Sequence, residues 1–407
     1  MRKLPLEGLK VADFCWVLAG PSIGRVLADY GATVVRVESA NRLDLARSLS
    51  PLHNGVVRSD NSAIFSDINA GKLSLSLDLA DPKGREVARE LIGWSDITLE
   101  SFSPGTMKKW CLDYETLRGE LPGLIMLSTC LMGQVGPLAS LAGFGSAGSA
   151  LSGIHYVTGW PDLAPTGFSG PYTDFVAPRF SLVALLAALD RRKRTGEGAY
   201  IDISQVETGL QFMAPEIAEY TTTGCIAERH GNDDAEASPN DVYPLFPGEE
   251  GEERFIAISI AGPAEWDVLC EVLELGSLSD LAGADLETRK AHSARIDAAI
   301  TARTAEQMAG PLELRLQRAG IAAHRVAGPM DLVTDPQLEG RRHYREASHP
   351  RRGETFLEST RMILSETPGG PQGPGPDLGE HTDLVLSEFL GLSAADIETY
   401  RAAGVLR

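Results

Sequence analysis

The first forty residues alternate between strand and helix patterns, and this alternation limits most strongly the folds open to the chain. The apolar run LKVADFC (9–15) predicts a buried strand, and AGPSIGRVLADYGA (19–32) predicts a helix that ends near Gly31. A second apolar run, TVVRVES (33–39), predicts another strand. A strand, a helix and a strand in so short a stretch form a βαβ unit, which implies a parallel sheet with helices on its faces.

The turn between the first strand and its helix bears on the kind of ligand. Its run, LAGPSIG (18–24), contains glycines but lacks the GxGxxG spacing, which argues against a dinucleotide site. The unit still suits a nucleotide-containing ligand, because open α/β sheets bind ligands at the carboxyl ends of their strands.

The same alternation continues along the first half of the chain. We expect a strand with one wet face at 73–79, an amphipathic helix at 81–95, further strands at 97–101, 124–129 and 200–204, and a polar, irregular segment at 41–67. A second module follows, with strands at 255–260 and 322–327 and helices from Pro263, Leu286 and Thr304. The predicted class is α/β, with a large Rossmann-like domain at 1–205 and 325–407, a linker at 206–224 and a small α+β domain at 225–324.

Composition excludes several classes of protein. The net charge of -19 argues against non-specific binding to nucleic acid. Five scattered cysteines without a CxxC pair indicate neither a disulfide framework nor a zinc site, and the eight histidines show no metal-ligand spacing. No uninterrupted apolar run reaches the roughly 18 residues of a membrane span. We therefore expect a cytoplasmic protein without a metal.

The stretch from Pro165 to Leu189 contains the most suggestive carboxylate. We expect a turn rich in glycine and proline, then a buried helix from Phe180, with Asp174 just upstream of that helix. A carboxylate there lies near free backbone N–H groups and the positive end of the helix dipole. Asp174 is then either a helix cap or turn residue, or a nucleophile at the mouth of the helix, and spacing alone leaves both open.

Long stretches of the chain resemble the family III CoA-transferases, the group that contains formyl-CoA transferase, carnitine CoA-transferase and α-methylacyl-CoA racemase. The most specific matches are LEGLKVADFCWVLAGPSIGRVLADYGATVVRVE, INAGKLSLSLDL, SFSPGTMKKW, TGWPDLAPTGFSGPYTDFVAPRF, ALDRRKRTGEGAYIDISQVE, AGIAAHRVAGPMDLVTDPQL and LGEHTDLVLSEFLGLSAADIETYRAAGV. They occur in the family's order from one end of the chain to the other.

The resemblance implies an activity and a role for Asp174, which matches the family's nucleophilic aspartate. Such an enzyme moves CoA from a donor such as succinyl-CoA to a carboxylic acid through an aspartyl-CoA thioester. The energy of the thioester is conserved, so the reaction needs neither ATP nor a metal. CoA enters as part of a substrate.

Four residues match family positions that contact CoA. The resemblance implies phosphate or nucleotide contacts for Arg36, Lys72 and Lys109, with a solvated surface charge as the alternative for each. It places Phe102 beside the adenine, and ordinary core packing is the alternative there.

Two residues are predicted to line the pocket for the acid. Leu18 stands where formyl-CoA transferase has a glutamine, which favours a bulkier or less polar acid, and Met132 lies in the divergent run LSTCLMGQVGP (127–137). The racemase branch needs a His and an Asp, as in AGHD, whereas this chain has AGFGSAG with Phe144 and Gly145. Its acid–base pair is broken, which favours transfer over racemisation, and His155 downstream has a core position as its alternative.

The resemblance also implies an assembly, an interlocked, ring-shaped homodimer, with a heteromer of paralogous subunits as a variant. Two other functions stay open at this point. One is an acyl-CoA racemase or isomerase, and the other is a non-catalytic CoA-binding subunit of a heteromeric transferase.

Overall fold

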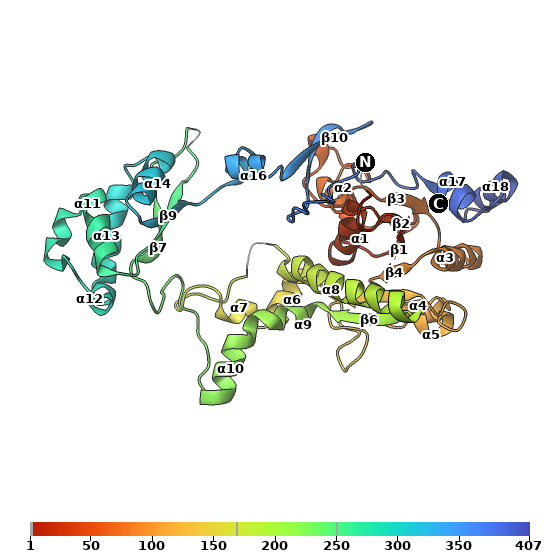
Figure 1. The fold of residues 1–407 in the computed structure, drawn as a ribbon, viewed down its shortest axis with the longest axis horizontal. Coiled ribbons are helices and arrows are strands. Elements are labelled where there is room, and N and C mark those ends of the chain that lie inside the picture. The colour runs from red at the N-terminus through yellow and green to blue at the C-terminus, as the bar shows by residue number, and fades with distance from the viewer. Residues whose placement is uncertain (1–2, 168–169, 250) are drawn as a thin grey trace. The chain divides into compact units, whose positions relative to one another are not determined.

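A computed structural model describes residues 3–167, 170–249 and 251–407 (Figure 1). The chain divides into two compact units. The larger contains Met1–Val157, Thr166–Ala227 and Pro336–Arg407, and the smaller contains Thr158–Pro165 and Glu228–Asp335. These limits differ from the predicted ones, because residues 206–224 fold as helices of the larger unit and residues 325–335 belong to the smaller unit.

A six-stranded parallel sheet lies at the centre of the larger unit, in the order β3-β2-β1-β4-β5-β6. Its strands are β1 (Lys10–Phe14), β2 (Thr33–Glu38), β3 (Leu73–Ser76), β4 (Ile97–Glu100), β5 (Ile125–Cys130) and β6 (Ala199–Ser204). This is the doubly wound order, in which the strand order reverses between β1 and β4 and ligands bind at the carboxyl ends there. The predicted Rossmann-like sheet is confirmed.

Helices cover both faces of this sheet. On one face, α1 (Ala19–Asp29) and α8 (Tyr172–Thr195) pack on apolar side chains of β1, β2, β4 and β5. On the other face lie α3 (Pro82–Trp94), α4 (Thr106–Lys109), α5 (Tyr114–Leu117) and the C-terminal elements α17 (Thr382–Leu384), η5 (Val385–Phe389) and α18 (Ala394–Ala402). Asp81 caps α3 by accepting the N–H of Lys83, and Pro82 occupies the first helical position, as expected from the sequence.

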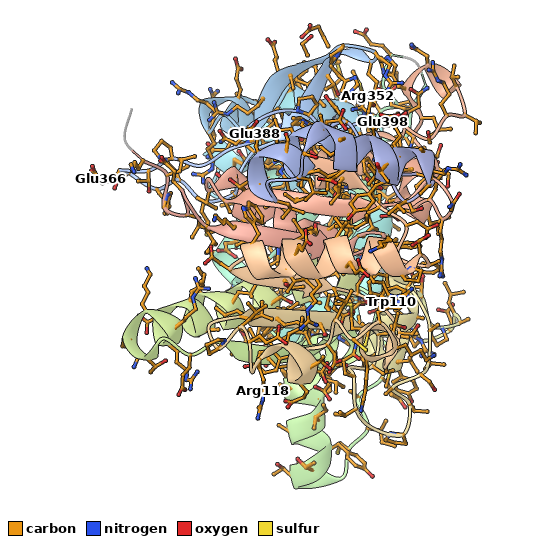
Figure 2. All side chains as sticks on the ribbon, turned by 90° about the vertical axis from the view of Figure 1, so that its right-hand side faces the viewer. Trp110, Arg118, Arg352, Glu366, Glu388 and Glu398 are labelled. Carbon is orange, nitrogen blue, oxygen red and sulfur yellow. The ribbon has the colours of Figure 1, made fainter. Side chains whose placement is uncertain are left out.

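The C-terminal helices are amphipathic and dock on the sheet. Leu386 and Ile397 are buried in the core, whereas Glu388 and Glu398 on the same elements are exposed (Figure 2). The C-terminal helices therefore belong to the larger unit.

The edge strand β3 has no wet face, so that prediction is wrong. Its four residues have an intermediate or buried environment, because a C-terminal segment pairs with its free edge. The Ser74 N–H donates to His381 Nδ1 at 3.2 Å, and the His381 N–H donates to the Ser74 carbonyl at 2.9 Å. The Ser76 N–H donates to Thr382 Oγ1 at 3.0 Å. A covered edge leaves no unpaired row of backbone groups to template aggregation.

Helix α8 begins at Tyr172, eight residues before the predicted start at Phe180. Asp174 therefore lies in its first turn and not upstream of it. Gly170 and Pro171 directly precede the helix, and Pro178 lies inside it. Among the described residues α8 has the length and composition of one membrane span, but it packs on β5, β6, α1 and α9 as a core helix does.

Small residues let α8 pack closely on its neighbours α6 (Gly145–Leu151) and α9 (Gln205–Leu210). A Cβ atom at Gly148 would lie 2.4 Å from Thr173 Oγ1, and one at Gly209 would lie 2.7 Å from Ser152 Oγ. The helical segment also includes α7 (Ile154–Val157), η3 (Gln211–Met213) and α10 (Ala214–Thr223).

The polar segment after β2 is more ordered than its composition predicts. It contains η1 (Leu45–Ser48), η2 (His53–Gly55) and α2 (Ala63–Ile68). Buried ion pairs fix it to the sheet, because Arg47 donates to both carboxylate oxygens of Glu38, at 2.9 and 2.7 Å. Phe65 packs beneath the guanidinium of Arg47 at 3.8 Å. This segment forms one wall beside the carboxyl ends of β1 and β2.

A hairpin in the larger unit escaped prediction. Strand β10 (Tyr344–His349) lies in the highly charged run RRHYREASHPRR (341–352) and pairs antiparallel with β11 (Gly353–Glu358), which directly follows that run; the charged run carries little apolar alternation. Helix α16 (Pro336–Gly340) precedes the hairpin.

The smaller unit has its own antiparallel sheet, in the order β7-β8-β9. Its strands are β7 (Asn240–Pro244), β8 (Phe255–Ser259) and β9 (Ala322–Arg325), and its helical elements are α11 (Pro263–Val272), η4 (Gly276–Leu281), α12 (Leu286–Ala291), α13 (Ser293–Thr304), α14 (Ala309–Arg318) and α15 (Pro329–Val333). Its core centres on the fully buried Trp266. The α+β module is confirmed, but Thr304 ends a helix and does not begin one, and β7 was not predicted.

Candidate active site

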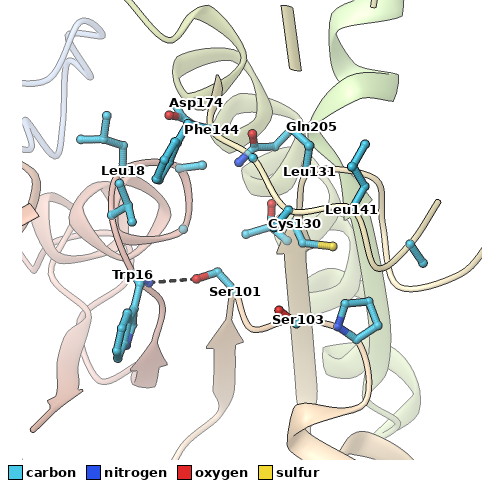
Figure 3. Close-up of a pocket in the computed structure, with 18 of the residues that line it drawn as sticks. Trp16, Leu18, Ser101, Ser103, Cys130, Leu131, Leu141, Phe144, Asp174 and Gln205 are labelled. Carbon is cyan, nitrogen blue, oxygen red and sulfur yellow. Dashed lines mark hydrogen bonds between the residues drawn. The ribbon is translucent and has the colours of Figure 1, made fainter. Parts of the chain in front are cut away.

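A cavity of about 160 Å³ lies at the carboxyl ends of β1, β4 and β5, at the point where the strand order reverses. Figure 3 shows Trp16 and Leu18 on the side of α1, and Gln205, the first residue of α9, on the side of α9. The lining residues are Trp16, Val17, Leu18, Ala19, Gly20, Ser101, Ser103, Pro104, Thr129, Cys130, Leu131, Ala139, Ser140, Leu141, Ala142, Gly143, Phe144, Asp174 and Gln205. The predicted nucleophile and one of the two predicted pocket residues, Leu18, therefore line the same cavity.

Among the described residues of this lining, Asp174 is the one ionisable carboxylate, and only 4% of it is exposed. Its Oδ2 accepts the N–H of Gly145 at 3.3 Å, and its side chain also bonds that of Gln205. Burial raises the pKa of Asp174 to about 6, and these two hydrogen bonds oppose the increase. Near neutral pH the side chain is therefore mostly a carboxylate, at the N-terminal end of a 24-residue helix.

Gly145 touches this carboxylate so closely that no larger residue fits. A Cβ atom there would lie 2.7 Å from Asp174 Cγ and 2.8 Å from the Pro171 carbonyl oxygen. Thr173 Oγ1 donates to the Gly145 carbonyl at 2.9 Å and holds the two helices together. The position at which the racemase branch carries its Asp therefore has no room for a side chain.

Two further residues, Phe144 and His155, also provide no acid–base group in this cavity. Phe144 lines the cavity with 57% of its surface exposed, and it has no group that could exchange a proton. His155 lies on α7 outside the lining, with its ring against Gly167, where a Cβ would meet Nε2 at 2.6 Å.

The second predicted pocket residue, Met132, is not part of the lining, so that prediction is wrong. Its neighbour Leu131 occupies the position instead, 5% exposed and facing the cavity beside Cys130.

Arg36 was predicted to lie at the CoA nucleotide and Lys72 to contact the CoA phosphates, and the structure corrects both assignments. Arg36 is fully buried, pairs with Asp44 and donates to the Cys15 carbonyl at 3.0 Å. Lys72 is 2% exposed and donates to Asp13 Oδ2 at 2.8 Å. Neither cation presents a free donor to solvent, so both stabilise the carboxyl ends of β1 and β2 from inside.

The Arg36–Asp44 pair also supports the cavity wall. Asp44 accepts the N–H of Val17 with both carboxylate oxygens, each at 3.1 Å. Val17 has a φ of 65°, a left-handed conformation that is strained for a β-branched residue. Holding Val17 there turns the chain sharply from β1 into α1. Sequence reasoning missed Asp44, and its position as the N-cap of a short helix was the only local signal.

A second cavity of about 300 Å³ adjoins the first and is lined by aromatic rings. Trp16 lines both cavities, and Phe102 packs edge-on against Trp16 and Trp110, with ring centroids 6.3 and 5.1 Å apart. The guanidinium of the exposed Arg42 lies 5.1 Å from the Trp16 ring. Arg42 is thus the accessible cation at this cavity, and sequence reasoning missed it. Lys109 is exposed at the end of α4, outside both linings.

In the part of the chain that the structure describes, no group of three or more His, Cys, Asp or Glu side chains is arranged to hold a metal ion.

Comparison with known proteins gives a consistent result. A model of CoA-transferase family III matches residues 6–382, the range that contains every site residue named above. The chain is 33% identical over 404 residues to the succinyl-CoA–D-citramalate CoA-transferase of Chloroflexus aurantiacus, covering 99% of this chain and 98% of that relative. It is 31% identical over 395 residues to the succinate–glutarate CoA-transferase of Agrobacterium fabrum, covering 95% and 96%.

A solved structure has the same fold. The crystal structure of a CAIB/BAIF family protein from Brucella suis matches with a TM-score of 0.86 at 28% identity, over 95% of this chain and 100% of that chain.

Proposed function

Because the chain belongs to CoA-transferase family III, we propose that its Asp174 carries CoA in transit as an aspartyl-CoA thioester. Membership makes the chain an enzyme that transfers CoA between an acyl-CoA and a carboxylic acid. The observation that carries the proposal is the position of Asp174, which is the one ionisable carboxylate lining the cavity where the strand order reverses.

The reaction runs through four attacks that conserve one thioester. An oxygen of the Asp174 carboxylate attacks the carbonyl carbon of the donor acyl-CoA; the C–S bond breaks and leaves a mixed anhydride and CoA thiolate. The thiolate attacks the aspartyl carbonyl, and the donor acid departs as a carboxylate. The acceptor carboxylate then attacks the aspartyl-CoA carbonyl; the C–S bond breaks and leaves a second mixed anhydride and CoA thiolate. The thiolate attacks the acceptor's carbonyl in this anhydride. Asp174 leaves as a carboxylate, and no net proton is consumed.

Backbone N–H groups near Asp174 suit this chemistry. Ala19 and Gly20 line the cavity in the first turn of α1, where N–H groups have no partner within the helix. The Gly145 N–H already donates to the Asp174 carboxylate. Donors fixed in place stabilise the oxyanion of each tetrahedral intermediate without reorganising. The apolar neighbours Leu18 and Leu131 exclude water, which would otherwise hydrolyse the thioester.

We place the CoA nucleotide in the second cavity, which supports the adenine position predicted for Phe102. The rings of Phe102, Trp16 and Trp110 offer stacking surfaces, and the exposed guanidinium of Arg42 offers a partner for phosphate. Trp16 belongs to both linings, so a pantetheine arm would pass it to reach Asp174. Lys109 remains a proposal for a phosphate contact.

Succinyl-CoA is the donor that we propose, because the names of both curated relatives include succinyl-CoA or succinate. The acceptor is then a small carboxylic acid, and Leu18 gives its pocket an apolar wall. The racemase alternative lacks both residues of its acid–base pair, and the contact at Gly145 leaves no space for one of them.

We also propose the interlocked homodimer expected from the family. Large apolar side chains are exposed along α8 and on the segment from α9 to α10, namely Phe175, Phe180, Val183, Leu186, Leu210, Phe212, Ile217 and Tyr220. Helix α10 has no buried residue at all. An exposed apolar surface of this extent is typical of an interface.

The test of the mechanism is capture of the aspartyl-CoA thioester. The enzyme is incubated with succinyl-CoA without an acceptor, treated with hydroxylamine, and digested for mass spectrometry. We expect an aspartyl hydroxamate at Asp174 and at no other carboxylate. Transfer activity without any modification of Asp174 would contradict the mechanism, and so would a high rate in Asp174→Ala. An inactive chain that binds acyl-CoA but never acquires the adduct would favour the non-catalytic subunit.

A further inference from the structure

The cavity contains two buried polar atoms that the protein leaves without a hydrogen-bond partner among the described residues. They are Oε1 of Gln205 and Oγ1 of Thr129. Gln205 is 8% exposed and Thr129 is 1% exposed. A buried polar atom without a partner is destabilising, so native proteins contain few of them, and those that line a cavity can be satisfied by a ligand.

The hydrogen bond to Asp174 fixes the direction of the Gln205 amide. A carboxylate accepts hydrogen bonds, so the amide nitrogen of Gln205 faces Asp174 and donates to it. The opposite orientation would bring the amide oxygen against the carboxylate and repel it. The unpartnered Oε1 is thus an acceptor, held beside the nucleophile.

Strand register brings Thr129 to the same end of the sheet. Cys130 on β5 pairs with Ser204 on β6, and Thr129 pairs with Ile203. Gln205 directly follows Ser204, so it lies one strand away from Thr129 and two register positions beyond it. Both side chains line one cavity. A single small group of a ligand can then meet both, because a threonine hydroxyl donates as well as accepts.

We propose that this pair recognises a hydroxyl group on the acceptor acid, which donates to Gln205 Oε1 and accepts from Thr129 Oγ1. This inference rests on the proposed function and narrows the acceptor to hydroxy acids. A carboxylate or a keto oxygen cannot donate to Oε1.

Acids with and without the hydroxyl group give the first test. The acceptor pairs are malate with succinate and citramalate with methylsuccinate, each with labelled acid and succinyl-CoA, and the better enantiomer represents each chiral acid. Sites that bond a substrate hydroxyl reject the analogue without it strongly, so we expect kcat/KM to favour the hydroxy acid by at least about tenfold. A ratio near one with the intact enzyme overturns the inference.

Variants show whether these two atoms cause the preference. Gln205→Met keeps the length of the side chain and removes the amide, and we expect the hydroxyl preference to fall by about tenfold or more. Thr129→Val keeps the shape and should reduce it by a smaller factor. Leu131→Met is the matched control in the same lining, and its preference should match that of the unmodified enzyme.

The comparison separates this inference from the mechanism. If Gln205→Met lowers kcat/KM equally for both acids of a pair and raises KM for succinyl-CoA, Oε1 serves an amide of CoA, and the inference fails. In that case the hydroxamate at Asp174 still forms in the unmodified enzyme, so the transferase mechanism stands. If Gln205→Met does not fold, Thr129→Val alone decides, and an unchanged preference in that variant is equally fatal.

Discussion

At the scale of single residues, Asp174 combines burial with a charge that the reaction requires. Its carboxylate is 4% exposed, has no cationic neighbour in the cavity lining, and depends on the Gly145 N–H and the Gln205 amide for stabilisation. A nucleophile that is poorly solvated attacks more readily, but the folded state is less stable for holding it.

Asp174→Asn should therefore stabilise the protein while abolishing transfer. The pKa of Asp174 is raised from 3.8 to about 6 in the folded state, so folding favours its protonated form. This stabilisation is complete below about pH 4 and is lost as the pH rises through 6. The neutral amide removes the penalty, so we expect a gain on the order of 2 kcal/mol at pH 7.5.

Urea denaturation at two pH values checks this expectation. The two proteins should have the same free energy of unfolding near pH 4, where Asp174 is protonated in the folded state. An equal gain at both pH values would assign the effect to packing instead of charge.

Gly145 lies so close to Asp174 that a larger residue there should displace the nucleophile. In Gly145→Ala, the new methyl group would lie 2.7 Å from Asp174 Cγ, so the carboxylate must move. Displacement of a reacting group by about 1 Å can reduce the rate by a factor of about 100, and we expect a loss of kcat of this order with little change in KM. Gly93→Ala is the matched control, because a Cβ there meets no atom within 4 Å. Equal kcat values for the two variants would contradict the tight contact.

At the scale of elements, the connection from β1 to α1 depends on an ion pair of Arg36, a residue that was predicted from the sequence to contact CoA. Arg36 holds Asp44, and Asp44 holds the strained Val17. The sequence has Arg36 and Lys72 at positions expected to contact CoA. Their carboxylate partners, Asp44 and Asp13, are either distant in sequence or lie in no recognisable motif. Their partners become visible only once the strands are placed side by side.

The roles of Arg36 and Arg42 can be separated by substitution. Arg36→Met leaves Asp44 and Glu38 buried without their shared cation, so we expect a loss of about 3–5 kcal/mol in the free energy of unfolding. Arg42→Ala should leave the melting temperature unchanged and raise KM for succinyl-CoA about tenfold, a typical effect of one lost phosphate contact. Thermal denaturation and steady-state kinetics on both variants make the comparison. If Arg36→Met were as stable as the unmodified enzyme but had a higher KM for succinyl-CoA, the result would support a contact between Arg36 and CoA instead.

The elements that could be predicted from sequence are those with strong patterns. Strands β1, β2, β4 and β5 are rich in Val, Ile, Leu and other apolar residues and are buried along nearly their whole length, as strands covered on both faces of a parallel sheet are. Strand β7 and the hairpin β10–β11 are short or highly charged and have no such signal. The start of α8 was placed too late because Pro171 directly precedes the helix and Pro178 lies inside it, so the segment resembles a loop in composition.

At the scale of the whole molecule, the parallel sheet of the larger unit followed from the opening βαβ unit, but the strand order and the limits of the two units did not. Residues 158–165 join the smaller unit from within the larger unit's sequence. Contacts between segments distant in sequence decide such a boundary, and composition alone does not record them. Recognition of the family located Asp174, whereas Gln205 and Thr129 emerged only from burial and missing partners.

The proposed dimer gives a prediction at this scale. A solution mass of twice the 43.6 kDa of the chain is expected from light scattering. The double variant Ile217→Glu and Tyr220→Glu places two charges on α10, which has no buried residue in the single chain, so it should dissociate the dimer without unfolding the protomer. Leu384→Glu, at an exposed apolar residue on α17, is the control. A monomer before any substitution would exclude the dimer.

The contact between Gly145 and Asp174 also constrains how such a chain can change over generations. The glycine codons GGT and GGC become aspartate codons through one nucleotide change, so from either codon the aspartate of a racemase pair is a single base away. In that variant the new side chain at position 145 would occupy the space of the Asp174 carboxylate. For this substitution to be tolerated, α6 and α8 would first have to move apart. The changes that separate the two helices supply no proton-transfer group, so they give no racemase activity by themselves.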